Sequence, residues 1–161
     1  MQAKEMTGQQ AYQKLAALCA RSEHCQQEML DKMRQWGVDE EEQAKVMARL
    51  VEERYVDDER FARAFVNDKV RYAKWGRRKI EQALWMKRID EQLARTVLDE
   101  VPDEDYIAIL RPALKQKRRS TKAASEYEMT MKLIKYALSR GFTMDVIKQC
   151  MEVDDETEFS D

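Results

Sequence analysis

The chain has 161 residues, about the size of one ordinary domain, and contains only four glycines and two prolines. So few turn-forming residues argue against a protein built from many β-strands. Hydrophobic residues make up 43% of the chain, which is enough for a core, so disorder of the whole chain is not expected. No apolar stretch approaches the roughly 20 residues that span a bilayer, and the first residues lack the pattern of an export signal. We therefore expect a soluble, cytoplasmic, all-α protein without membrane contact.

Apolar residues recur at spacings of three and four along almost the whole chain, a pattern typical of amphipathic helices. In chain order, the pattern predicts helices within residues 12–21, 29–33, 46–51, 61–72, 80–89, 93–101, 107–116, 131–138 and 143–151. The acidic run from Asp39 to Glu42 falls in the first turn of one helix, where negative charge is favourable. Asp57 and Asp58 precede another, which an aspartate can begin by accepting hydrogen bonds from free backbone amides. A basic polar stretch from Lys115 to Ser125 precedes the last two helices.

The same apolar spacing occurs three times, which indicates an internal repeat. In each copy two residues four apart are followed by a third five residues later: Met29, Met33 and Val38; Ile80, Leu84 and Ile89; Leu133, Ala137 and Phe142. The turn position before the third residue is Gly37, Arg88 or Gly141, and glycine there suits a left-handed residue at a helix end.

Each copy also begins with its own helix, so the unit is three helices long. A unit of this size buries its apolar faces only partly by itself and is expected to stack on its neighbours. The fold predicted is all-α, with three tandem three-helix repeats forming an elongated, curved array. The repeats cover 9–56, 57–102 and 103–152, and an acidic tail at 153–161 is expected to be disordered. A compact bundle with accidentally similar spacing is the alternative.

The residues needed for catalysis or metal binding do not occur in recognisable patterns. Cys19, Cys25 and Cys150 fit neither a disulfide framework nor a zinc knuckle, and we expect them to be reduced. The single histidine, His24, lies beside Cys25, but adjacent residues point to different sides of a helix, so His24 has no credible serine or cysteine partner. There is also no glycine-rich phosphate-binding loop. We therefore expect no enzyme, no cofactor and no metal site.

Positive charge is concentrated in the middle of the chain. From Lys69 to Arg88 there are eight basic residues against one acid, Glu81, with aromatic residues among and beside them. A second basic patch without acids runs from Arg111 to Lys122. Lysine and arginine neutralise phosphates and release counterions, while aromatic rings stack on bases. The pattern favours a polyanionic partner, either nucleic acid, an acidic protein groove or a protein filament that contains nucleic acid, over an ordinary solvated helix face.

Four motifs, in order and over nearly the whole chain, resemble those of the RecX family of regulatory proteins. They are ALCARSE at 17–23, RYVDDERFA at 54–62, KWGRRKI at 74–80 and RGFTMDVI at 140–147. The resemblance implies tandem three-helix repeats and a modulator that binds RecA recombinase filaments on single-stranded DNA. Members of the family lodge in the filament groove and suppress the ATPase, strand-exchange and co-protease activities of RecA. Two features depart from the family: Arg88 stands where glycine is common, and the acidic tail matches no family motif.

We therefore predict a regulator of recombination, DNA repair and the SOS response that acts as a monomer. Its expected partners are the RecA filament and single-stranded DNA, with double-stranded DNA left open. The residues expected to contact them are Arg71, Lys74, Arg77, Arg78, Lys79, Lys87, Arg88, Lys117, Arg118 and Arg119. The alternative is a helical-repeat nucleic-acid-binding protein without a RecA-specific role.

Overall fold

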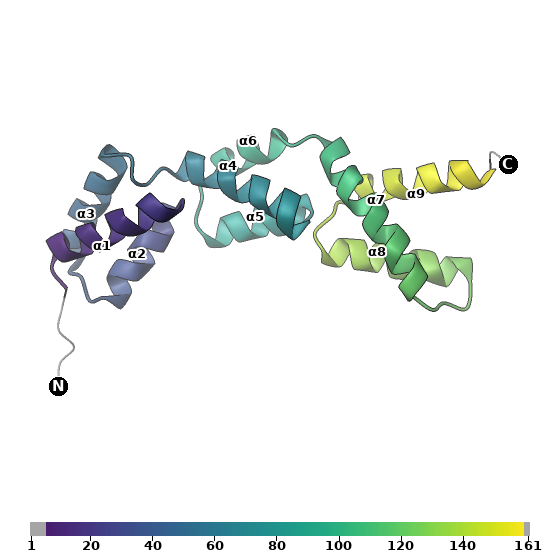
Figure 1. Ribbon diagram of the computed structural model, residues 1–161, viewed down its shortest axis with the longest axis horizontal. Coiled ribbons are helices and arrows are strands. Elements are labelled where there is room, and N and C mark those ends of the chain that lie inside the picture. Colours follow the sequence, from purple (N-terminus) through teal and green to yellow (C-terminus); the bar gives the residue numbers. More distant parts are fainter. Residues whose placement is uncertain (1–5, 160–161) are drawn as a thin grey trace. The chain divides into compact units, whose positions relative to one another are not determined.

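The computed structural model describes the backbone of residues 6–159 and the side chains of residues 6–151. In chain order its elements are α1 (Gly8–Arg21), α2 (Gln26–Gln35), α3 (Glu40–Glu52), α4 (Asp58–Asp68), the π-helical turn η1 (Lys69–Ala73), α5 (Arg77–Met86), α6 (Glu91–Asp99), α7 (Asp103–Ser120), α8 (Glu126–Ser139) and α9 (Met144–Phe159) (Figure 1). All of these elements are helical, which confirms the predicted all-α fold of three-helix repeats. No helix in the described part of the chain combines the length and apolar character of a membrane span.

Side chains at the helix starts explain where several helices begin. Thr7 and Gln10 form a reciprocal capping box at α1. As predicted, Asp57 caps α4, since its Oδ1 accepts a hydrogen bond from the Arg60 amide at 3.1 Å. Asp58 serves a different helix, because its Oδ1 accepts from the Gln26 amide in the first turn of α2 at 2.8 Å. Both carboxylates of this acidic pair are therefore used to begin helices.

The predicted left-handed turns are present in all three copies. The backbone φ is 74° at Gly37, 54° at Arg88 and 94° at Gly141. Each of these residues follows the second helix of its repeat, where a left-handed residue lets the chain reverse into the third helix. The correspondence deduced from spacing therefore extends to the backbone conformation at the turns.

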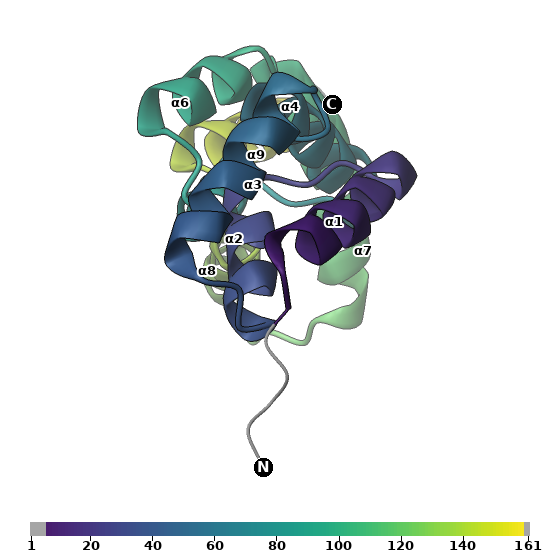
Figure 2. The same cartoon turned by 90° about the vertical axis from the view of Figure 1, so that its left-hand side faces the viewer.

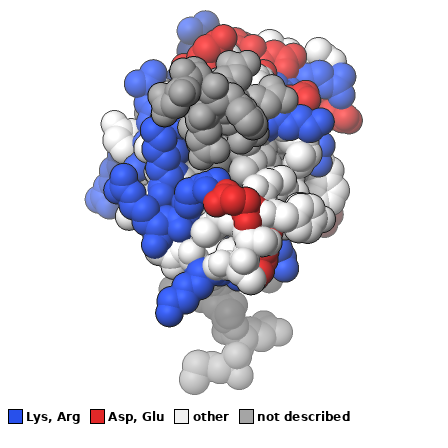
Figure 3. Space-filling model, turned by 90° about the vertical axis from the view of Figure 1, so that its right-hand side faces the viewer, with Lys and Arg blue, Asp and Glu red and all other residues white. Residues whose placement is uncertain are grey.

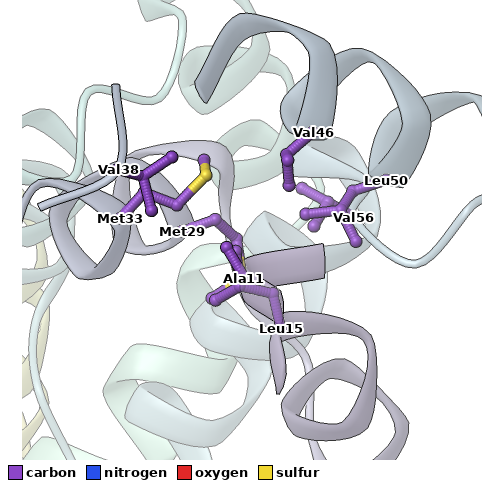
Figure 4. Packing of buried hydrophobic residues seen from close by; sticks show 8 residues of the cluster. All are labelled: Ala11, Leu15, Met29, Met33, Val38, Val46, Leu50 and Val56. Atoms are coloured by element: carbon purple, nitrogen blue, oxygen red, sulfur yellow. The ribbon is translucent and has the colours of Figure 1, made fainter. Parts of the chain in front are cut away.

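The first repeat shows how the apolar spacing becomes a core. Helices α1 and α2 both pack against α3 (Figure 2). Their inward-facing residues form one buried cluster (Figure 4): Ala11, Leu15, Met29, Met33, Val38, Val46, Leu50 and Val56. The buried residues within each helix, such as Ala11 and Leu15 or Val46 and Leu50, are four apart, because residues at that spacing share one face of a helix.

Contacts divide the chain into two compact units, and the division falls inside the middle repeat. The N-terminal unit comprises Met1–Phe65 and Leu84–Ala94, and the C-terminal unit comprises Val66–Ala83 and Arg95–Asp161. Of the middle repeat, residues 57–65 and 84–94 therefore belong to the first unit, and residues 66–83 and 95–102 belong to the second. Within the C-terminal unit, α7 packs against η1, α8 and α9.

Two elements differ from the helices expected from sequence. The helix expected over 61–72 is α-helical only to Asp68 and then opens into the π-helical turn η1. Lys74 ends that turn in a left-handed conformation, with φ 59° and ψ 45°. Helix α7 also runs to Ser120, through the first half of the predicted polar stretch. The side chains of the predicted acidic tail, 153–161, lie outside the described residues, so its disorder stays a prediction.

Candidate nucleic-acid interface

Two glycine-containing segments of the C-terminal unit dock backbone to backbone. The Gly76 amide donates to the Arg140 carbonyl at 2.8 Å, and the Arg78 amide donates to the Gly141 carbonyl at 2.9 Å. A Cβ on Gly76 would lie 2.2 Å from the Phe142 nitrogen, and a Cβ on Gly141 would lie 2.6 Å from the Lys79 nitrogen. Only glycine at both positions allows this approach. The glycines of two motifs found in the sequence therefore join the start of α5 to the end of α8.

This docking changes the electrostatics at the start of α5. The amides in the first turn of a helix lack intrahelical partners and carry partial positive charge. Here the Gly141 carbonyl accepts from one of them, the Arg78 amide, and the first turn of α5 contains no acidic residue. The first turn instead holds Arg77, Arg78 and Lys79, although the helix dipole disfavours cations at that end. Positive charge is thus gathered where the fold itself does not favour it.

Three of the predicted binding residues in the C-terminal unit have polar partners within the chain. Arg77 Nη2 lies 2.6 Å from Asp99 Oδ1, and Arg118 Nη1 lies 3.2 Å from Glu126 Oε2. Arg71 Nε donates to Asn67 Oδ1 at 2.7 Å. All three remain at least partly exposed, so the partners orient the guanidinium groups and leave them accessible.

The other predicted residues of this unit project from its surface. Lys79 Nζ lies 4.5 Å from the centre of the Trp75 ring, which Lys69 Nζ also approaches to 4.9 Å. Both ammonium groups therefore make cation–π contacts with Trp75, one of the aromatic residues of the basic segment. Further exposed basic side chains are Lys74, Arg78, Lys117 and Arg119. Figure 3 shows Lys and Arg side chains gathered on the left of the face in view.

Lys87 and Arg88 belong to the N-terminal unit and have structural roles there. Lys87 Nζ pairs with Glu28 Oε2 at 3.0 Å. Burial alone would raise the pKa of Glu28, but hydrogen bonds from Lys87 and from the Cys25 amide hold this pKa below its ordinary value. Arg88 is the left-handed turn residue of the middle repeat. These two residues therefore belong to a different unit from the other eight predicted binding residues.

A pocket of about 440 Å³ opens between Lys74, α7 and the end of α8. Its lining residues are Lys74, Ile109, Pro112, Ala113, Gln116, Lys117, Ser120, Tyr136, Arg140 and Phe142. Sequence reasoning identified Lys74 and Lys117 as binding residues but missed Tyr136 and Arg140. The sequence feature that could have identified them is their spacing of four at the end of α8, which places them on one helix face beside the glycine turn.

Three family models match the chain: RecX, first three-helix domain, at residues 11–50, second three-helix domain at 57–98, and third three-helix domain at 103–151. The "Regulatory protein RecX" of Acinetobacter baylyi is 29% identical over 147 residues, 91% of this chain and 89% of that protein. The protein of that name from Oceanobacillus iheyensis is 27% identical over 136 residues, and the match spans 84% of this chain but only 50% of the relative.

A solved structure gives the same result at the level of the fold. The crystal structure of RecX from Lactobacillus salivarius superposes with a TM-score of 0.82 at 19% identity, over 92% of this chain and 96% of that one. The matches of the three domain models follow one another in order along the chain. Together with the three-helix repeats and the motif glycines that join them, they show that the chain belongs to the RecX family.

Proposed function

We propose that this protein binds RecA filaments on single-stranded DNA and inhibits the ATPase, strand-exchange and co-protease activities of RecA. Membership of a family of regulatory proteins supports a regulator rather than an enzyme. The basic side chains of the C-terminal unit supply the chemistry for a polyanionic partner. Through this inhibition the protein limits recombination, DNA repair and the SOS response in the cytoplasm.

The observation that carries the proposal is the cluster of cations in the first turn of α5. Arg78 and Lys79 are exposed at the positive end of the helix dipole, and α5 has no acid in its first turn. This arrangement lowers stability slightly, by up to about 1 kcal/mol for each cation, and therefore favours a role in binding over a role in folding. An anionic partner would remove that repulsion when it binds.

The mechanism requires no contact with the nucleotide of RecA. A protein that binds one state of a filament more tightly than another shifts the population toward that state. If the inhibited state is the one that this protein binds, ATP hydrolysis falls, and the ratio of affinities for the two states limits how far it falls. Basic side chains held in one rigid unit supply that difference, because they match one spacing of anionic groups along the filament.

The direct test is ATP hydrolysis by the cognate RecA on single-stranded DNA, titrated with this protein. We expect inhibition at far fewer protein molecules than are needed to coat the DNA. Inhibition only at coating stoichiometry would instead support the alternative, a nucleic-acid-binding protein without a RecA-specific role. No inhibition at micromolar excess would exclude the proposal.

The double variant R78A/K79A tests the surface itself. It leaves the Arg77 to Asp99 ion pair intact and removes unfavourable charge from the helix start, so we expect unfolding free energy to be unchanged or slightly higher. Inhibition of RecA should weaken, and the salt dependence of single-strand binding should become shallower. Lys135→Ala removes one charge at an exposed lysine of α8, away from the first turn of α5 in sequence, and should leave inhibition unchanged.

A further inference from the structure

The pocket between Lys74, α7 and the end of α8 is lined by basic residues and by apolar residues of α7 between positions 109 and 113, which we call the apolar wall. Lys74, Lys117 and Arg140 supply the cations, and Ile109, Pro112 and Ala113 supply the apolar surface. We propose that this pocket holds one nucleotide of single-stranded DNA, with its phosphate against the cations and its base against the apolar wall. The inference rests on the proposed function, because it names the DNA contact of the same basic surface.

The size of the pocket favours a nucleotide over an acidic protein side chain. Its volume of about 440 Å³ lies in the roughly 300 to 1,000 Å³ range of small-molecule sites. A single carboxylate would fill only a corner of that space and would leave the apolar wall uncovered. A nucleotide carries both an anion and a planar, largely apolar surface, and the basic and the apolar lining residues match these two parts.

The cations of the pocket are not neutralised by the described part of the protein. Within residues 6–151, no carboxylate forms an ion pair with Lys74, Lys117 or Arg140. Lys117 Nζ and Arg140 Cζ instead lie 5.1 and 5.6 Å from the centre of the Tyr136 ring. The ring holds both positive groups beside the pocket without cancelling their charge. Arg77 and Arg118, outside the pocket, do have carboxylate partners.

The backbone at Lys74 is a second indication of binding. Lys74 is left-handed, with φ 59°, a conformation that glycine adopts without cost and other residues adopt at about 1 kcal/mol or more. A lysine at this position therefore costs stability and places an ammonium group in the lining of the pocket. The neighbouring hydrogen bond from Gly76 to Arg140 brings this segment to the end of α8.

Lys74→Gly separates binding from folding, because glycine suits the left-handed backbone and removes only the charged side chain. By fluorescence anisotropy with a labelled oligothymidylate at low salt and without RecA, we expect Kd to rise roughly tenfold. The slope of log K against log salt should shrink by about 0.7. Lys135→Ala, with the same loss of charge, should change Kd less than about twofold.

Ala113→Leu tests the apolar wall, since it narrows the pocket and keeps every charge. Loss of the base contact should raise Kd at least fivefold, or about 1 kcal/mol, with the salt slope unchanged. In the full-length wild-type protein, NMR titration with a thymidine dinucleotide should shift the amides of Ala113, Gln116 and Arg140, and an equal concentration of a glutamate dipeptide should not. Unchanged Kd in both variants, or shifts with the glutamate dipeptide alone, would overturn the inference.

These measurements are independent of RecA, so the two proposals can fail separately. If the variants bind DNA normally while the wild type inhibits RecA, the pocket assignment is wrong and the proposed function stands. If both variants lose DNA binding but the wild type does not inhibit RecA ATPase, the pocket assignment stands and the regulatory function is wrong.

Discussion

At the scale of single residues, Gly76 illustrates how a motif glycine can be required by a neighbouring backbone. In Gly76→Ala, the added methyl group would lie 2.2 to 2.4 Å from backbone atoms of Gly141 and Phe142, which cannot rotate away. We expect the free energy of unfolding to fall by about 3 kcal/mol or more. Chemical denaturation followed by circular dichroism would measure the loss.

Gly8→Ala is the matched control for this change. Its methyl group would also meet an atom at 2.3 Å, but that atom is Oε2 of Glu42, the end of a flexible side chain. Gly8 also begins α1, where alanine is a better helix former. We expect a change of less than about 1 kcal/mol in either direction. Equal losses for the two variants would show that the close backbone approach is not what requires Gly76.

Cys25 should make the stability of the protein sensitive to alkaline pH. Burial raises the pKa of this thiol to about 11, whereas an exposed thiol ionises near about 8.5. Between these values the unfolded chain loses the proton first, so stability is complete below about pH 8.5 and falls as pH rises toward 11. The thiol should also react slowly with alkylating reagents.

The measurement is the free energy of unfolding as a function of pH for Cys25→Ala and for the wild type. Cys25→Ala should give the flatter profile above pH 8.5, even if its stability at neutral pH is lower. Cys19→Ala is the comparison, because burial also raises the pKa of Cys19 but this side chain is partly exposed. Parallel profiles for all three proteins would contradict the assignment.

At the scale of the helices, α2 depends on a carboxylate from another repeat. At its start the Glu28 side chain accepts a hydrogen bond from the Cys25 amide at 3.1 Å, and Asp58 accepts one from the Gln26 amide. Asp58→Ala should lower the free energy of unfolding by about 1 kcal/mol and speed hydrogen exchange at the Gln26 amide. Asp58→Asn keeps an oxygen acceptor and should restore most of both properties. If asparagine is no better than alanine, the hydrogen bond is not the source of stability.

Most of the helices could be predicted from the sequence because each carries its own apolar stripe and local start signals. Asp57 and Gly141 could be placed in advance for the same reason, since a cap and a left-handed turn are local features. The π-helical turn before Lys74 could not, because no residue pattern distinguishes it from an α-helix that continues to residue 72. Local spacing also gives no sign that Gly76 meets Arg140, 64 positions further along the chain.

The binding surface was predicted less completely than the fold. The basic composition identified the segments, but it could not tell which cations have internal partners. Arg77 meets Asp99 and Lys87 meets Glu28 only through the tertiary structure. Arg140 was read as part of a turn motif, and its place beside the pocket follows from the packing of α8 against α7. A cluster of charged residues can be recognised in a sequence, whereas a pocket can be recognised only in the folded structure.

At the scale of the whole molecule, regulation of a filament and coating of DNA make different demands on the core. DNA coating needs positive charge in many possible arrangements, whereas filament inhibition as proposed needs basic groups at fixed separation. The double variant V97A/V101A removes apolar groups from a buried and a half-buried position and keeps every charge. It should cost about 2 to 4 kcal/mol of stability.

We expect V97A/V101A to reduce inhibition of RecA ATPase much more than binding to naked single-stranded DNA. Both activities should be measured on the same preparation, below the temperature at which the variant unfolds. If the two activities fall together, or if inhibition persists after DNA binding is lost, the requirement for a rigid unit is wrong.

The docking of Gly76 on the turn at Gly141 has a consequence for how such chains can be rearranged. By the repeat spacing, Cys25 is the counterpart of Gly76, and its Sγ lies 3.9 Å from the Lys87 carbonyl, where there is room for a side chain. In a chain shuffled so that the first repeat directly preceded the third, that side chain would be forced onto the backbone at Phe142. Because only Gly76 fits the contact between the second and third repeats, the repeats cannot be exchanged, and this one small residue fixes their order.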